Sequence, residues 1–170
     1  MTATAADRSH ADRRKAAIEA LKSATAARSD PESAERAVKD ALSLAPEEYD
    51  VQLGAYRFYF YNHRYAEALP HAEAILGLAA RDLNLPADWR AVAPVDARFS
   101  AIERRPGLYL QALLAWGYCQ LRIGQSASGE GDAAQALGRA AIAKVAALDP
   151  TDRFGAAAIL AAIETGADEA

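Results

Sequence analysis

Prolines and capping residues interrupt this chain of 170 residues between runs of helix-forming sequence. Within the segments, apolar side chains recur three and four residues apart, as Ala17, Leu21 and Ala24 do. This spacing places them on one face of an α-helix, whereas a half-buried strand would alternate apolar and polar residues. No segment shows a convincing alternation, and alanine, a strong helix former, dominates the apolar residues. The sequence therefore predicts an all-α protein.

The breaks between segments carry residues that begin helices. Asp30 can accept hydrogen bonds from free backbone N–H groups, and Pro31 fits a first helical position, where its missing N–H costs nothing. Thr151 or Asp152 can cap the last helix in the same way. We expect helices at about residues 11–27, 31–46, 48–62, 64–79, 106–124, 132–148 and 154–165.

The length of the chain suits one compact domain with a single hydrophobic core. We expect this domain at residues 11–166, after a disordered tail at residues 1–10 and before a short tail at residues 167–170. Residues 80–105 break the helical rhythm with prolines and a tryptophan, and we interpret them as an insertion. A small-residue linker is expected at residues 125–131.

The charge and the apolar pattern exclude several classes of protein. A formal net charge of −4 argues against a general nucleic-acid binder, which needs a basic face for phosphates. No apolar run approaches the roughly 20 residues that cross a bilayer, and the first residues lack the apolar core of a signal peptide. We therefore expect a cytoplasmic protein whose partner is neither a nucleic acid nor a membrane.

Residues that commonly carry chemistry are few and scattered. His10, His63 and His71 do not have the spacing of metal ligands, and Cys119, the only cysteine, lies among apolar residues typical of a core. Residues 129–131 lack the lysine and the preceding strand of a phosphate-binding loop. We expect no catalytic site, no metal site and no cofactor.

One spacing recurs toward the ends of two predicted helix pairs. The pattern has a small residue, a larger one four positions later, a small one three positions after that, and proline five positions further on. The two occurrences are Ala34, Val38, Ala41 and Pro46, and Gly138, Ile142, Val145 and Pro150. Small side chains at such positions allow two helices to cross closely, while larger ones fill the holes beside them.

With this spacing, the chain resembles the tetratricopeptide-repeat family over roughly residues 15–150. Tyr59 matches the family's aromatic position in a second unit, and Trp116 with Gly117 matches a third. Tyr56 stands where the family has its first-helix glycine. The resemblance implies a right-handed α-solenoid of about three helix pairs, interrupted by the insertion and closed by a C-terminal capping helix at about residues 152–165.

The resemblance also implies a concave groove, lined by the first helix of each pair, that binds a protein or an extended peptide. Tyrosine and arginine are enriched among residues that dominate binding energy. Arg57 and Arg122 are expected on one wall, one repeat apart, where they would hold the carboxylates of an acidic partner. Carried onto this sequence, the partner-binding residues are Leu53, Arg57, Phe60, Tyr61, Leu114, Tyr118 and Arg122, with Trp89 as a lid.

The insertion is too apolar for a pure linker. Val95, Phe99 and Ile102 have the spacing of a short amphipathic helix at about residues 94–103, and we expect it to pack on the repeats. Its arginines slightly outnumber its acids, so it forms either a solvated rim or a clamp for an acidic partner.

We therefore expect a scaffold, adaptor or chaperone that is a monomer or a small homo-oligomer. Three alternatives remain at this stage. The size and layout resemble cargo chaperones of bacterial secretion systems. A self-assembling structural protein would dock its terminal helix on the next copy, and a small-molecule enzyme is the third alternative.

The fold class is testable by far-ultraviolet circular dichroism. Because every predicted element is a helix, we expect a spectrum dominated by helical minima and a cooperative thermal transition. A substantial strand component would contradict the all-α prediction.

Overall fold

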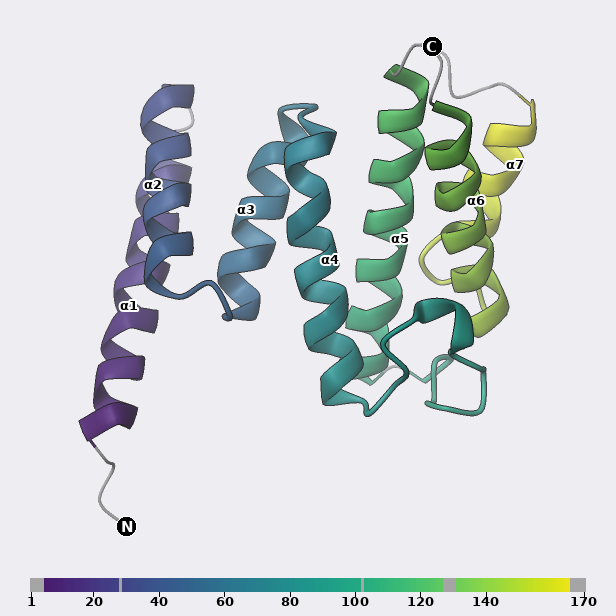
Figure 1. Cartoon of the computed structure of the whole chain (residues 1–170), viewed down its shortest axis with the longest axis horizontal. Helices are drawn as coiled ribbons and strands as arrows, with labels where there is room; N and C mark the ends of the chain where they lie inside the picture. Colours follow the sequence, from purple (N-terminus) through teal and green to yellow (C-terminus); the bar gives the residue numbers. More distant parts are fainter. Residues whose placement is uncertain (1–4, 28, 102, 127–130, 166–170) are drawn as a thin grey trace. The chain divides into compact units, whose positions relative to one another are not determined.

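The computed structural model describes residues 5–27, 29–101, 103–126 and 131–165. Within them the chain forms seven α-helices, one short 3-10 helix and no strand, which confirms the all-α prediction (Figure 1). The helices are α1 (Ala5–Ala26), α2 (Pro31–Leu44), α3 (Tyr49–Tyr61), α4 (Tyr65–Asp82), η1 (Trp89–Ala91), α5 (Arg104–Ser126), α6 (Gly131–Leu148) and α7 (Ala156–Thr165). No described helix is both long and apolar enough to cross a membrane.

Contacts divide the chain into two compact units, residues 1–71 (unit 1) and residues 72–170 (unit 2), and the division falls within α4. Each unit is described by itself, and the single domain expected from the sequence stays a prediction. Ile102, the tail at residues 167–170 and most of the expected linker lie outside the described residues.

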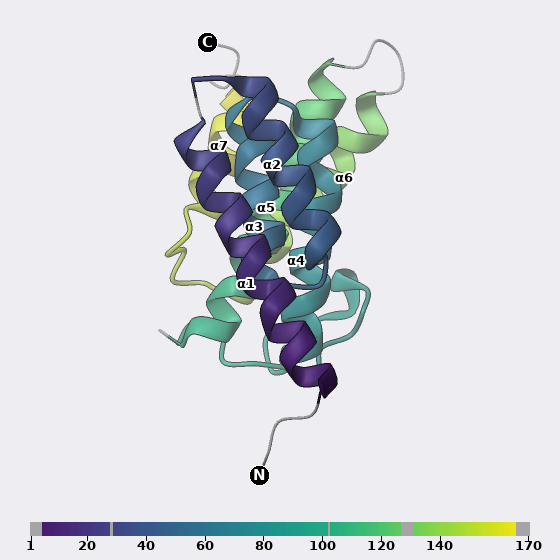
Figure 2. The ribbon, with the colours of Figure 1, turned by 90° about the vertical axis from the view of Figure 1, so that its left-hand side faces the viewer.

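In unit 1, α1 and α2 form a closely packed antiparallel pair (Figures 1 and 2). Their buried contact is made by Ala17, Ala41 and Ala45 together with Val51 at the start of α3. Alanines at a crossing let two backbones approach, and the leucines around them supply the apolar area that drives packing. The cap of α2 is the one expected, because Asp30 accepts a hydrogen bond from the Ser33 backbone N–H at 3.3 Å.

Helix α1 begins at Ala5, so residues 5–10, which were expected to belong to a disordered tail, are helical, and residues 1–4 lie outside the described residues. Side chains near this end of the helix contact a residue far away in the sequence. His10 lies 3.1 Å and Arg14 2.8 Å from the carboxylate of Glu48, which precedes α3. This partner is far away in the sequence, so local helical periodicity could not place the start of the helix.

Helices α3 and α4 meet around His71, which is half-buried in unit 1. Its ring stacks on Tyr59 with 5.6 Å between centroids, and its Nδ1 lies 2.8 Å from Gln52 Oε1. Burial lowers the pKa of His71, which favours the neutral ring. Gln52 in turn donates to the Pro46 carbonyl at 2.6 Å, so this buried amide is paired on both sides. His71 therefore packs between α3 and α4.

In unit 2, α5 and α6 pack most closely at glycines. A Cβ added to Gly138 would lie 2.5 Å from the carbonyl oxygen of Gly117 and 2.9 Å from the backbone nitrogen of Leu121. Only glycine fits such an approach, because backbone atoms cannot move aside as a flexible side chain can. Gly138, which the repeated spacing singled out, therefore lies where two helices touch.

The amphipathic helix expected at residues 94–103 is absent from the described part of this segment, and that prediction was wrong. Residues 94–101 form turns, with Val95 91% exposed and Phe99 2% exposed. Asp96 accepts a hydrogen bond from the Ala93 backbone N–H at 2.8 Å, which closes a turn at the point where the helix was expected to begin. The helical element of the insertion is η1, which is capped by Asp88.

The insertion packs on the rest of unit 2, as expected, through cationic side chains that bind its backbone. Lys144 of α6 donates to the Val92 carbonyl at 2.8 Å, and the Arg153 guanidinium donates to the carbonyls of Phe99 and Ala101. Arg153 is itself held by the buried carboxylate of Asp149 at 3.1 Å. These bonds satisfy carbonyl groups that have no helix to pair with.

Helix α7 packs on α6 and follows a tight turn. Asp152, with φ of 49°, accepts a hydrogen bond from the Ala157 backbone N–H at 3.0 Å. Gly155 adopts φ of 73°, a left-handed conformation that suits glycine. Asp152, one of the two expected caps, is therefore the cap of the last helix.

We predict opposite effects for two glycine-to-alanine changes. Gly138→Ala should lower the free energy of unfolding by about 1–3 kcal/mol, because the new methyl group overlaps the backbone of α5. Gly77→Ala on α4 should raise it by up to about 1 kcal/mol, because its methyl group would meet only the Arg81 side chain, at 3.7 Å, and alanine favours helix. Thermal and urea denaturation measure both, and equal effects would contradict the close approach.

Candidate functional site

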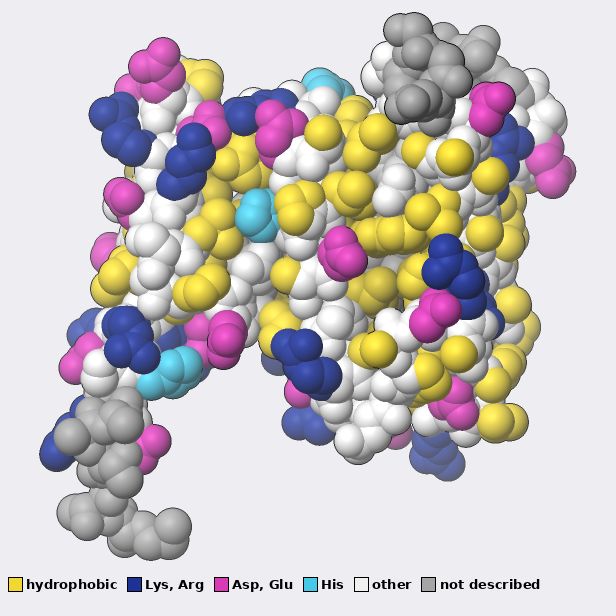
Figure 3. Space-filling model, in the orientation of Figure 1, with side chains coloured by type: hydrophobic (Ala, Val, Ile, Leu, Met, Phe, Trp, Pro, Cys, Tyr) yellow, Lys and Arg dark blue, Asp and Glu magenta, His cyan; other side chains and the backbone are white. Residues whose placement is uncertain are grey.

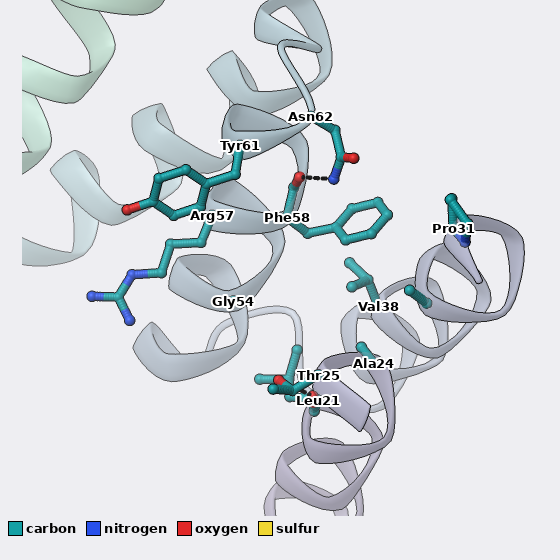
Figure 4. A pocket seen from close by; sticks show the side chains of 11 residues that line it. Leu21, Ala24, Thr25, Pro31, Val38, Gly54, Arg57, Phe58, Tyr61 and Asn62 are labelled. Atoms are coloured by element: carbon teal, nitrogen blue, oxygen red, sulfur yellow. Dashed lines mark hydrogen bonds between the residues drawn. The ribbon is translucent and has the colours of Figure 1, made fainter. Parts of the chain in front are cut away.

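A cleft of about 550 Å³ opens in unit 1 between the α1–α2 pair and α3 (Figure 4). Its size falls in the range of sites that hold a small molecule or a few side chains. Apolar residues dominate its walls and polar ones lie toward its edge. It is lined by Leu21, Ala24, Thr25, Pro31, Ala34, Val38, Gly54, Arg57, Phe58, Tyr61 and Asn62.

The missing side chain of Gly54 shapes one wall of the cleft. A Cβ at this position would lie 2.7 Å from the nearest methyl carbon of Leu21, so α1 and α3 approach closely there. Farther along α3, Phe58 points toward α2, where Val38 lies on the opposite wall (Figure 4). The cleft is therefore narrow at Gly54 and has a ring available at Phe58 for apolar contact.

Arg57 and Tyr61 lie one turn apart on α3 and are among the lining residues, and their side chains point away from Phe58 and Val38 (Figure 4). The Tyr61 side chain is 75% exposed. Arg57 is also exposed, and among the described residues it has no ion pair or hydrogen bond. By contrast, Asn62 uses its amide to donate to the Phe58 carbonyl at 2.7 Å. The arrangement offers an apolar wall with an available cation and a phenol beside it.

An ion cluster joins α2 to the α3–α4 turn beside the cleft. Glu35, next to the cleft residue Ala34, accepts from Arg64 at 2.7 Å and lies 2.9 Å from Lys39 Nζ. Arg64 also pairs with Glu67 at 2.8 Å and covers the Tyr59 ring at 4.8 Å. The hydrogen bond from Arg64, followed by that from Lys39, lowers the pKa of Glu35 to about 2. This cluster links α2 to the end of α3 and so fixes the spacing between the two helices.

Two of the residues predicted from the family resemblance, Arg57 and Tyr61, therefore lie together at the cleft. Leu53 and Phe60 are on the same helix but half-buried, and Phe60 packs on Tyr56 and Tyr65 with ring centroids 5.2 and 5.5 Å apart. Their role in binding stays a prediction. The cleft residues that sequence reasoning missed include Phe58 and Gly54, and the signal for Gly54 was a glycine inside a helix.

The remaining predicted residues belong to unit 2. Leu114, Tyr118 and Arg122 are half-buried along α5 and do not line the unit 1 cleft. Trp89 is 8% exposed and packs near Trp116, with ring centroids 6.0 Å apart. It lies in a second cavity, formed within unit 2. That Arg57 and Arg122 lie on one wall of a common groove stays a prediction.

Histidine, cysteine and carboxylate side chains are the residue types in the described part of the chain that could hold a metal ion. No cluster of three or more histidine, cysteine, aspartate or glutamate side chains is arranged there to hold a metal ion. Cys119 is fully buried, and burial raises the pKa of its thiol to about 12, so the unreactive neutral form dominates at pH 7. On the face shown in Figure 3, charges of both signs are scattered over the helices without a large patch of either.

A comparison with curated proteins finds an uncharacterized 19.8 kDa protein in the nifW 5′ region of Azotobacter chroococcum mcd 1. It is 38% identical over 133 residues, which cover 75% of this chain and 68% of that protein. No family model and no solved structure matches the chain.

The ion cluster predicts a pH dependence of stability. Because the pKa of Glu35 is about 2 in the folded state and near 4.5 when unpaired, its contribution is present above pH 4.5 and is lost as the pH falls toward 2. Glu35→Gln should lower the free energy of unfolding at pH 7 by roughly 1–2 kcal/mol, a value reduced for solvent screening of partly exposed partners.

Urea denaturation at pH 7, 4.5 and 3 measures this effect. The Glu35→Gln variant should lose less stability than the wild type between pH 4.5 and 3. Glu32→Gln, on the same helix and exposed, is the matched control and should follow the wild type. Parallel pH curves for all three proteins would show that the cluster contributes nothing to stability.

Proposed function

The chain belongs to the same family as the uncharacterized 19.8 kDa protein of Azotobacter chroococcum mcd 1, and we propose that it binds a segment of a protein partner in the unit 1 cleft. It acts as a scaffold, adaptor or chaperone in the cytoplasm. We further propose that the helix pairs α1–α2, α3–α4 and α5–α6 are the three repeats of a tetratricopeptide-like solenoid.

The observation that supports this proposal most directly is an exposed arginine without an ion pair in the described residues, beside a cleft with apolar walls. A bound carboxylate gives Arg57 charge-assisted hydrogen bonds that it does not make within unit 1. An apolar side chain of the same partner fills the space between Phe58 and Val38, and Tyr61 adds a further contact on the flank of α3. The partner segment is therefore acidic with at least one bulky apolar residue.

The test is affinity capture from the native host with three versions of the protein: wild type, the double variant Arg57→Ala with Tyr61→Ala, and the control Arg36→Ala. Arg36 is an exposed arginine on α2 that does not line the cleft. A partner retained by wild type and control should fall at least tenfold with the double variant, because each bond to arginine contributes about 1.5–3 kcal/mol. Quantitative mass spectrometry measures the difference.

Thermal denaturation separates binding from folding in this test. The melting temperature of the double variant should match the wild type, since both altered side chains are exposed. Identical captured proteins for all three versions would refute the cleft as the binding site. A triple variant that also carries Arg122→Ala tests whether unit 2 contributes to binding of the same partner. The name of the relative makes the nifW product the first protein to look for among those captured.

A further inference from the structure

Two walls of the unit 1 cleft, α2 and α3, are joined at one end by the chain itself. The connection is residues 45–48, and the two helices run antiparallel (Figure 1). Beside this connection they share a buried cluster, in which Ala45 packs with Val51. At the other end of the pair, Pro31 begins α2, Asn62 follows α3, and both residues line the cleft. The cleft therefore opens at the end where the connection does not hold the helices together.

Tyr59 acts as a spacer between the two helices at this end. The residue is 5% exposed, and its hydroxyl lies 3.4 Å from Glu35 Oε1 on α2. Its ring stacks on His71, with 5.6 Å between the centroids, and is covered by the Arg64 guanidinium at 4.8 Å. A side chain packed in this way has little room to move. Tyr59 therefore limits how closely α2 and α3 can approach each other.

The ion cluster supplies an attraction that opposes separation of the helices. Two nitrogens of Arg64 donate to the two oxygens of Glu35, at 2.7 and 3.2 Å, and Lys39 Nζ lies 2.9 Å from the same carboxylate. A two-point bond between guanidinium and carboxylate fixes geometry better than an ordinary surface ion pair. The backbone N–H of Arg64 also donates to the Tyr59 carbonyl at 2.9 Å. The attraction on Glu35 is therefore transmitted to α3.

We propose that Glu35 and Arg64 form a latch that preorganises the unit 1 cleft for its partner. Tyr59 limits the approach of the walls and the latch limits their separation, so the width between Val38 and Phe58 is set before binding. A partner side chain then meets walls that are already in place, and less conformational freedom is lost on binding. Glu35 and Arg64 are therefore positioning residues.

This inference rests on the proposed function, because a fixed width matters only to a cleft that binds a partner. The width itself can be measured without any partner. An unchanged width after loss of the latch would refute the inference and leave the binding function standing. Failure to capture a partner would refute the binding function and leave the measured width standing.

The experiment measures the distance between two spin labels by pulsed electron paramagnetic resonance. The labels are attached to cysteines introduced by Glu32→Cys on α2 and Ala66→Cys at the start of α4, both at exposed positions of unit 1. Cys119 is buried, and the chain without added cysteines checks that it takes no label. Glu35→Gln in the labelled chain should lengthen the mean distance by about 2 Å and broaden its distribution.

Glu67→Gln is the matched control. It removes the other carboxylate that pairs with Arg64, at 2.8 Å, but Glu67 belongs to α4 and does not join α2 to α3. The distance in this variant should equal that in the labelled chain without further change. Equal lengthening by Glu67→Gln and Glu35→Gln would overturn the proposal, because any lost bond to Arg64 would then loosen the turn.

Changing both members of the latch separates one shared link from two independent effects. Arg64→Gln should lengthen the distance as Glu35→Gln does, and the double variant should lengthen it no further, because each change removes the same link. Circular dichroism before freezing establishes that every variant is folded. Additive lengthening in the double variant, or distances in folded variants that match the original, would show that packing alone sets the width and would overturn the proposal.

Discussion

Close contact between helices through alanine and glycine is the constraint on which both units depend. In unit 1, Ala17 and Ala41 are fully buried where α1 meets α2, and in unit 2, Gly138 lies against the backbone of α5 at Gly117. Small side chains bury little apolar area themselves, but they bring backbones close enough for the larger neighbours to interdigitate. Larger side chains such as Leu21 and Leu42 in unit 1 and Ile142 in unit 2 pack beside these crossings.

The same constraint explains why aromatic residues gather at particular places. An alanine-rich helix pair has little bulk, so Tyr59, stacked on His71 and covered by Arg64, fills much of the space between α3 and its neighbours in unit 1. Gln52 enters this interior paired with His71. In unit 2 the corresponding bulk comes from the insertion, whose Trp89 and Phe99 are buried against α5 residues.

Much of the helical order could be predicted from the sequence, because it depends on local signals. Apolar spacing and caps such as Asp30 act within a few residues. The start of α1 and the path of the insertion could not be predicted, because His10 and Phe99 are held by Glu48 and Arg153, far away in the sequence. Spacing alone gives no information about such partners.

For the candidate site, the family resemblance indicated Arg57 and Tyr61, and the structure adds the cleft beside them. The resemblance placed a glycine at the position of Tyr56, whereas the close approach occurs two residues earlier, at Gly54. The cavity of unit 2 had one signal in the sequence. Tyr109 and Trp116 are seven residues apart, which places them on one face of a helix.

The anchoring of the insertion has a consequence for sequence variation within this family. Lys144 and Arg153 bind carbonyl oxygens of the insertion, which every residue type carries, so these bonds depend on the path of the backbone and not on the identity of its side chains. Exposed positions such as Val95 can therefore diverge widely among relatives while the loop keeps its course. Evolution can change the outer surface of this loop without rebuilding the helices that support it.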